Sequence, residues 1–164
     1  MRSQIKPIYW IILAIILAPA VGLAVDPVGH WPFNGDLSDA VGGADAVFNG
    51  GTPSFGPGKA AQALVFDGAD DYTDVMQGNV DAYTISAWVN PARLGAASII
   101  ARTSSSGPTT HWSHQLRITA DNLFQHYLWD GSARTVLGTT GAAVDTWYHV
   151  AITAINSGAV RLYV

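Results

Sequence analysis

Short runs in which apolar and polar residues alternate recur along the chain after residue 25. In the clearest run, residues 83–89, tyrosine, isoleucine, alanine and valine alternate with threonine, serine and tryptophan. A period of two is typical of a β-strand with one buried face. The pattern therefore predicts a strand here and further strands over 30–33, 44–48, 63–66, 72–75, 98–102, 114–119, 123–129, 134–138, 147–153 and 160–164.

Turn-forming residues separate these runs. Asn, Asp and Gly gather at 34–36, 49–51, 67–68, 121–122, 130–131 and 156–158. Asn and Asp tolerate left-handed backbone angles and Gly adopts them freely, so tight hairpins are expected over 116–129 and 129–137. No helical pattern of ten or more residues follows residue 25. The sequence predicts an all-β domain, a two-sheet antiparallel sandwich or jelly roll spanning residues 25–164.

The composition agrees with this class and excludes several functions. All 12 acidic residues are Asp, and Lys occurs only at Lys6 and Lys59. Glu and Lys favour helices, whereas Asp favours turns. The net charge of -4, without any run of Lys and Arg, excludes a nucleic-acid partner. The absence of Cys excludes disulfides, thiolate zinc sites and a cysteine nucleophile.

Residues 1–24 have the layout of a secretory signal peptide. Arg2 and Lys6 precede an apolar run over 8–17, and small residues follow up to Ala24. We expect cleavage after Ala24, with an uncleaved membrane anchor as the alternative, in which case this segment is the membrane contact. In either case the rest of the chain is predicted to be secreted or extracellular, at the cell surface.

Four sequence blocks, in order, resemble those of laminin-G-like, concanavalin A-like jelly-roll domains. They are residues 30–43, 58–72 and 83–91, and the pair of segments 145–151 and 160–164. The resemblance implies two curved antiparallel sheets and further strands beyond Val164. Because the chain ends inside a predicted strand, we expect a jelly roll that is incomplete at its C-terminus.

The resemblance also implies function. Members of this family mostly bind carbohydrates, proteins or lipids, and many hold calcium. We therefore predict a non-catalytic extracellular binding module for carbohydrate or cell-surface protein ligands. The alternatives are a fragment of a glycan-cleaving enzyme and a structural or adhesive segment of an envelope protein. Glycoside hydrolysis needs two carboxyl groups, which the resembled enzymes supply from a Glu pair, and this chain has no Glu.

Asp36, Asp39 and Asp45 form the candidate calcium site. They lie within ten residues in a Gly-rich stretch, and carboxylates are ligands that calcium prefers. In the resembled family an Asp near Asp39 commonly helps to hold calcium. The alternative is that these three residues cap turns. A second acidic cluster over 67–74 is assigned to turn formation and edge protection.

Aromatic residues provide candidate ligand contacts. Trp112 and Trp129 lie at strand ends near loops, where their rings can stack on sugars, although packing within a hairpin would also explain them. Trp31, Trp88 and Trp147 lie within predicted strands and are expected to fill the core. The five histidines show no zinc-binding motif, so no His-based metal site is expected.

Overall fold

The structure of the chain is a computed structural model that describes residues 26–75, 82–104, 111–129, 132–155 and 158–164. The predicted leader, residues 1–24, lies outside this part. The described residues form strands and loops, and no helix occurs among them. Accordingly, none of the described segments is a helix long and apolar enough to cross a membrane. The predicted all-β class is confirmed.

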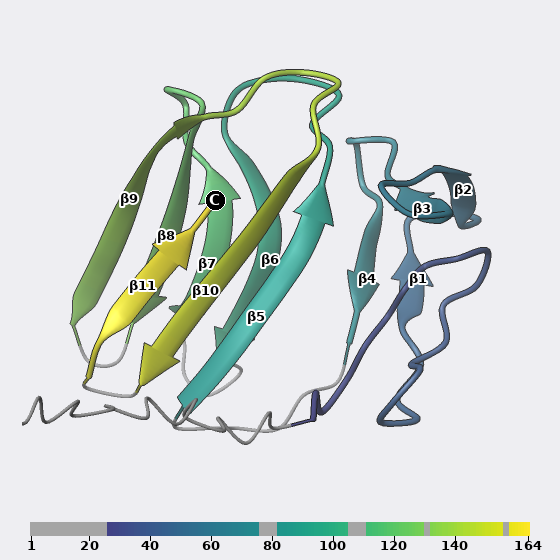
Figure 1. Cartoon of the computed structure of the whole chain (residues 1–164), viewed down its shortest axis with the longest axis horizontal. Coiled ribbons are helices and arrows are strands. Elements are labelled where there is room, and N and C mark those ends of the chain that lie inside the picture. Colours follow the sequence, from purple (N-terminus) through teal and green to yellow (C-terminus); the bar gives the residue numbers. More distant parts are fainter. Residues whose placement is uncertain (1–25, 76–81, 105–110, 130–131, 156–157) are drawn as a thin grey trace, which may run out of the picture.

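Two antiparallel sheets pack face to face (Figure 1). The three-stranded sheet has the order β11-β10-β5, and the four-stranded sheet has the order β6-β7-β8-β9. The strands of the first sheet are β5 (Ala82–Val89), β10 (Tyr148–Ile155) and β11 (Val160–Tyr163). Those of the second are β6 (Ala97–Ser104), β7 (His111–Ile118), β8 (Leu123–Trp129) and β9 (Ala133–Gly141).

Two small sheets lie beside β5 (Figure 1). One pairs β1 (Val47–Asn49) with β4 (Tyr72–Asp74), and the other pairs β2 (Ser54–Pro57) with β3 (Gln62–Val65). The ammonium group of Lys59, in the β2–β3 turn, lies 5.1 Å from the centre of the Trp88 ring on β5. This cation–π contact links the small sheets to the outer face of the three-stranded sheet.

The core fills the space between the two large sheets. Leu116 and Phe124 of the four-stranded sheet are fully buried, as are Val150 and Ile152 of the three-stranded sheet. Because side chains alternate along a strand, each strand sends every second residue into this layer. Each such side chain contributes about 1.5–3 kcal/mol of burial energy, and the core therefore holds the sheets together.

The β7–β8 hairpin is as tight as the sequence predicts. Asn122 adopts a φ of 62°, which asparagine tolerates, and the amide of Thr119 donates to the carbonyl of Leu123 at 2.9 Å. This turn pairs His114 with Leu128 and so fixes the register of both strands. The β8–β9 hairpin is also confirmed by its pairing, although its turn, residues 130–131, lies outside the described residues.

In the N-terminal region one predicted strand is absent, and one observed strand was not predicted. Residues 30–33 form no strand: Phe33 has a φ of 52°, and the Trp31 indole donates to the Ala44 carbonyl at 2.9 Å, so side-chain bonds hold this segment. Strand β2 was not predicted, because its sequence ends in Gly56-Pro57, residues that are typical of turns.

Candidate functional site

Polar side chains cover the outer face of the four-stranded sheet. On β7, Gln115 and Arg117 alternate with buried residues, and on β8 Gln125 and Tyr127 do the same. The hairpin register places Gln115 opposite Tyr127 and Arg117 opposite Gln125. Directly opposite residues share one face of a sheet, so all four side chains point away from the core.

Hydrogen bonds connect these side chains into a row across three strands. Arg117 donates from Nε to Gln125 Oε1 at 2.7 Å, and its Nη2 donates to the same oxygen. Arg117 Nη1 donates to Gln115 Oε1 at 3.2 Å, and Gln115 Nε2 donates to Ser98 Oγ at 3.2 Å. The guanidinium carbon lies 5.8 Å from the centre of the Tyr127 ring. Arg117 is therefore held in place by neighbours on both strands.

A hollow of about 440 Å³ opens on this row. Its walls are the small residues 96–98, the polar side chains of Gln115, Arg117 and Gln125, and the strand end and turn at 118–120. Among the described residues of this lining, Arg117 is the charged one, and none of them contributes a carboxylate. The hollow is therefore a polar, positively charged depression on the sheet surface. The strands that line the hollow were predicted from the sequence, but these side chains were not identified as a site. The alternation along the predicted β7–β8 hairpin could have shown that they share the outer face.

Of the two tryptophans predicted as ligand contacts, the structure describes the side chain of Trp129 but not that of Trp112. Trp129, at the end of β8, is 38% exposed. Its side chain lies on the same outer face of the strand as those of Gln125 and Tyr127. It does not line the hollow. The backbone of Trp112 belongs to β7, but its side chain lies outside the described part. Ligand binding by either residue stays a prediction.

The three candidate calcium ligands bind backbone amides. Asp39 Oδ1 accepts from the amides of His30 at 2.8 Å and Val41 at 3.0 Å. Asp45 Oδ1 accepts from the amide of Asp39 at 2.9 Å, and Asp36 Oδ1 accepts from the amide of Ser38 at 3.0 Å. Within the described residues these three carboxylates do not form a group close enough to hold one ion. The geometry supports the turn-capping alternative, and calcium binding there stays a prediction.

Asp39 is the most strongly perturbed of these carboxylates. The hydrogen bond from the His30 amide, with further bonds from Val41, Gly42 and Ala44, lowers the pKa of Asp39 to about 2. Donors that bind the ionised form favour it. A Cβ on Gly42 would lie 2.7 Å from Asp39 Oδ2 and 2.5 Å from the Val28 carbonyl oxygen, so the loop closes tightly around this carboxylate.

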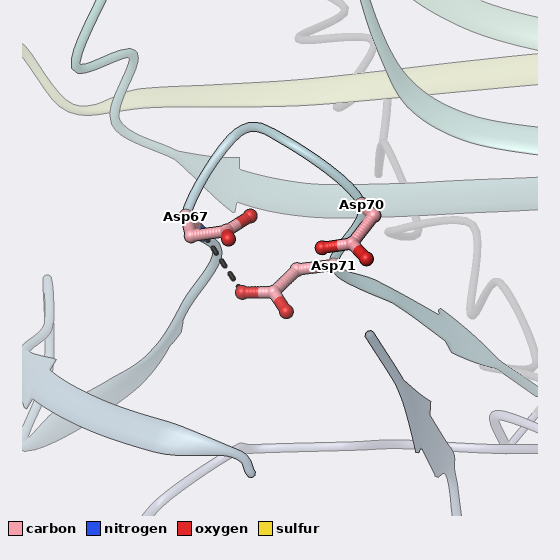
Figure 2. A group of neighbouring side chains, drawn as sticks. All are labelled: Asp67, Asp70 and Asp71. Carbon is pink, nitrogen blue, oxygen red and sulfur yellow. Dashed lines mark hydrogen bonds between the residues drawn. The ribbon is translucent and has the colours of Figure 1, made fainter. Parts of the chain in front are cut away.

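A second group of carboxylates lies together in the turn between β3 and β4. Asp67, Asp70 and Asp71 converge in Figure 2, with one oxygen of each lying within 4.8 Å of the others. Asp71 Oδ2 accepts from the amide of Asp67, and Asp67 Oδ1 accepts from the amide of Ala69, both at 2.8 Å. The bond from Ala69 is the main cause that lowers the pKa of Asp67. These bonds shape the turn, as the sequence predicted for this cluster.

A polar cluster between the sheets was not predicted. The Tyr83 hydroxyl, from β5, lies 2.7 Å from Nδ1 of His114 on β7 and 3.3 Å from Nε2 of His126 on β8. His126 is fully buried, and its Nδ1 has no hydrogen-bond partner within the described part of the chain. In the alternation along β7 and β8, both histidines occupy positions whose side chains point toward the core. This alternation is the feature of the sequence from which their burial could have been predicted.

Burial sets the charge state of this cluster. It lowers the pKa of His126 to about 4, with the nearby charges of His114 and Arg134 acting in the same direction. It also lowers the pKa of His114, with Arg102 contributing. The pKa of the Tyr83 hydroxyl is raised to about 12 by burial. All three side chains are therefore neutral at pH 7, and the cluster is a structural link between the sheets.

Trp88 corrects one expectation about the core. Its side chain is 50% exposed, on the outer face of β5, where its ring centre lies 5.1 Å from that of His149 on β10. The alternation in residues 83–89 placed it on the side opposite Tyr83, and that pattern prevailed over the general tendency of large aromatics to be buried. Trp31 and Trp147 are half-buried.

Comparisons with known proteins agree with this architecture. Domain 4 of AbnA, a GH43 extracellular arabinanase from Geobacillus stearothermophilus, whose structure was solved in complex with arabinotriose, is similar to this chain with a TM-score of 0.65. The sequence identity is 23%, and the match covers 83% of this chain and 69% of that one. At this identity the likeness shows the fold. No protein of curated function matches the chain.

A family model for the concanavalin A-like lectin/glucanases superfamily matches residues 67–164. This range contains both large sheets and the row of side chains from Ser98 to Gln125. The resembling blocks at 83–91 and 145–164 lie inside the match, whereas the block at 30–43 precedes it. The chain belongs to the concanavalin A-like lectin/glucanases superfamily.

Proposed function

We propose that this chain is a non-catalytic carbohydrate-binding module that binds a glycan on the outer face of its four-stranded sheet. The observation that carries the proposal is the hydrogen-bonded row of Ser98, Gln115, Arg117 and Gln125 beside a hollow of about 440 Å³. The fold supports it, because the similar domain of the arabinanase was solved with arabinotriose. Fold alone does not fix function, so the side chains of this face have to account for binding.

The chemistry of this face suits a sugar. A sugar ring offers hydroxyl groups around its rim, and planar Gln and Arg side chains form directed hydrogen bonds to such groups. Tyr127 adds an aromatic ring beside them, and aromatic rings contribute large apolar contact area. Because neighbouring strands fix the positions of these side chains, they lose little freedom when a ligand binds.

The carboxylates of the described residues support a binding role over a hydrolytic one. Glycoside hydrolysis needs one carboxyl group that stays protonated beside a second that is ionised. Asp67, Asp70 and Asp71 are close together, but they lie at the surface of a turn and the pKa of Asp67 is lowered. Asp39 is likewise shifted toward the ionised form. Neither group lines the hollow.

The setting is part of the proposal. A leader over residues 1–24 would place the module outside the cytoplasm, where glycans of cell surfaces and extracellular polymers occur. Calcium is not required by this model of binding, because the row around Arg117 contains no carboxylate. A chelator is therefore expected to leave glycan binding by this face unchanged.

Titration calorimetry with a panel of soluble oligosaccharides, arabinotriose included, tests the proposal. We expect the whole chain to bind at least one member, and the Gln115→Ala and Gln125→Ala variants to bind it about two- to tenfold more weakly, since one lost hydrogen bond to a bound ligand is worth roughly 0.5–1.5 kcal/mol. Arg161→Ala, on the outer face of the other sheet, is the matched control and should bind normally. Binding that persists in both glutamine variants would refute this site.

A further inference from the structure

We propose that the hollow over β6, β7 and β8 binds the carboxylate of an acidic sugar, so that the ligand of this module is a glycan containing uronic acid. The inference rests on the proposed function and specifies its ligand. It comes from the direction of the hydrogen bonds around Arg117, which determine what is left for a ligand.

The side-chain amide oxygens of this row already accept hydrogen bonds from Arg117. An arginine side chain donates and never accepts, so Gln125 and Gln115 must each turn their Oε1 atoms toward Arg117. Gln125 Oε1 receives two donors from the guanidinium, and Gln115 Oε1 receives one. A ligand in the hollow therefore finds few free acceptors on these side chains.

Donors remain in excess. Of the five N–H groups of a guanidinium, the bonds to the two glutamines use one on Nε, one on Nη1 and one on Nη2. One N–H on each terminal nitrogen therefore has no acceptor within the described part of the chain. The Nε2 group of Gln125 likewise donates to none of the described residues, and that of Gln115 uses one donor, to Ser98. The row is complementary to a ligand rich in acceptors.

The charge of the hollow points the same way. Among the described residues, Arg117 contacts Gln115, Gln125 and Tyr127, and none of these neutralises its charge. None of the described Asp residues lies in the lining of the hollow, although the chain as a whole has a net charge of -4. A local positive charge with no carboxylate beside it attracts an anionic group to this place.

The geometry favours a carboxylate over other anions. A planar guanidinium matches the two oxygens of a carboxylate through parallel hydrogen bonds, and such charge-assisted pairs are about twice as strong as neutral ones. The glutamines of the row fix the guanidinium plane beside the Tyr127 ring, so little freedom remains to be lost. Among sugars, a uronic acid carries this group on the ring itself.

Titration calorimetry of the whole chain tests this with trimers of galacturonate, glucuronate and mannuronate, each beside its methyl ester. The ester keeps the sugar ring and its hydroxyl groups, removes the charge, and adds one methyl group to each carboxyl. We expect at least one uronate to bind about tenfold or more tightly than its ester, because a charge-assisted pair is worth roughly 1.5–3 kcal/mol. We also expect this preference to weaken as salt is raised.

Two conservative variants test whether Arg117 causes the preference for uronate over its ester. Gln125→Glu keeps the shape of residue 125 but sets a carboxylate against the guanidinium, and Arg117→Lys keeps the charge but removes the planar pair of donors. Both should abolish the tenfold preference for the acid, while the control Arg161→Lys retains it. Circular dichroism checks that all three variants fold.

The outcomes separate this inference from the function on which it rests. Equal binding of uronate and ester, a preference that survives in Gln125→Glu and Arg117→Lys, or tighter binding of sulfated than of carboxylated trimers would each overturn the inference while leaving a glycan-binding module. If neither these trimers nor the neutral oligosaccharides bind, both the function and the inference are refuted.

Discussion

The hydroxyl of Tyr83 lies 2.7 Å from Nδ1 of His114, and this hydrogen bond joins the two sheets through the interior of the sandwich. Tyr83 belongs to β5 and His114 to β7, which lie in different sheets. The same hydroxyl reaches His126 on β8 at 3.3 Å. Apolar contacts alone would allow the sheets to slide, whereas directed polar contacts are satisfied in one arrangement.

Replacing Tyr83 tests the strength of this link. Tyr83→Phe keeps the ring and leaves His114 and His126 without their shared partner. We expect the free energy of unfolding to fall by roughly 1–3 kcal/mol, the cost of a buried polar group left unpaired. Urea denaturation followed by tryptophan fluorescence measures it. Tyr163→Phe, which alters an exposed tyrosine, is the control; an equal loss in both variants would contradict the assignment.

Stability should fall on mild acidification because of His126. Its folded pKa of about 4 lies below its ordinary value of 6.5, so the unfolded chain binds the proton more readily. The free energy of unfolding is therefore highest above pH 6.5 and falls as the pH is lowered toward 4. The total loss due to His126 is up to about 3 kcal/mol. His114 acts in the same direction.

Urea denaturation at several pH values between 7 and 5 detects this loss before most carboxylates titrate. The His126→Gln variant cannot take up the proton, so its stability should depend less steeply on pH in this window. Asp39 does not interfere, because its contribution is lost only as the pH falls from its ordinary pKa of 3.8 toward about 2. A slope unchanged by His126→Gln would show that burial does not hold this histidine neutral.

The core makes the two sheets interdependent. Phe124 is fully buried, and its ring centre lies 5.1 Å from that of Tyr148 on the opposing sheet. Phe124→Ala should lower the free energy of unfolding by roughly 3–5 kcal/mol, through lost burial and the cavity that remains. Leu137→Ala, at an exposed position of β9, should change it by less than about 0.5 kcal/mol. Similar losses in both variants would place the core elsewhere.

Asp39 organises the loop before β1. Asp39→Asn removes the charge that the amides of His30, Val41 and Ala44 bind, and it puts a donor in place of one acceptor. Hydrogen exchange measured by NMR should become faster at these three amides and stay unchanged at Val150 in the core. The same measurement with and without calcium tests the predicted ion: protection that rises on adding calcium would favour it over turn capping.

Much of the fold follows from local pattern. The range 123–129 predicted from alternation coincides with β8, and the predicted strand over 83–89 differs from β5 by one residue. Asn122 fixes the β7–β8 turn by its own backbone preference. These features depend on neighbours in sequence, and a period of two reports them directly.

The site depends on contacts that local pattern does not contain. Tyr83 meets residues 31 and 43 positions away, and Gln115 meets a serine 17 positions away. Such contacts depend on how the sheets pack and how distant strands pair, and the alternation of apolar and polar residues carries no information about either. For the same reason the closeness of Asp39 and Asp45 in sequence suggested an ion, whereas the path of the loop turns their oxygens toward backbone amides.

Each of the two central strands β7 and β8 has one side in the deepest part of the core and the other facing outward. Leu116 and Ile118 are buried beside Arg117, and Phe124 and His126 are buried beside Gln125. The outward-facing side chains therefore lie on strands whose opposite face is packed into the core. Free and occupied forms should be nearly superimposable, so a ligand would find its partners already in position and recognition would resemble lock and key.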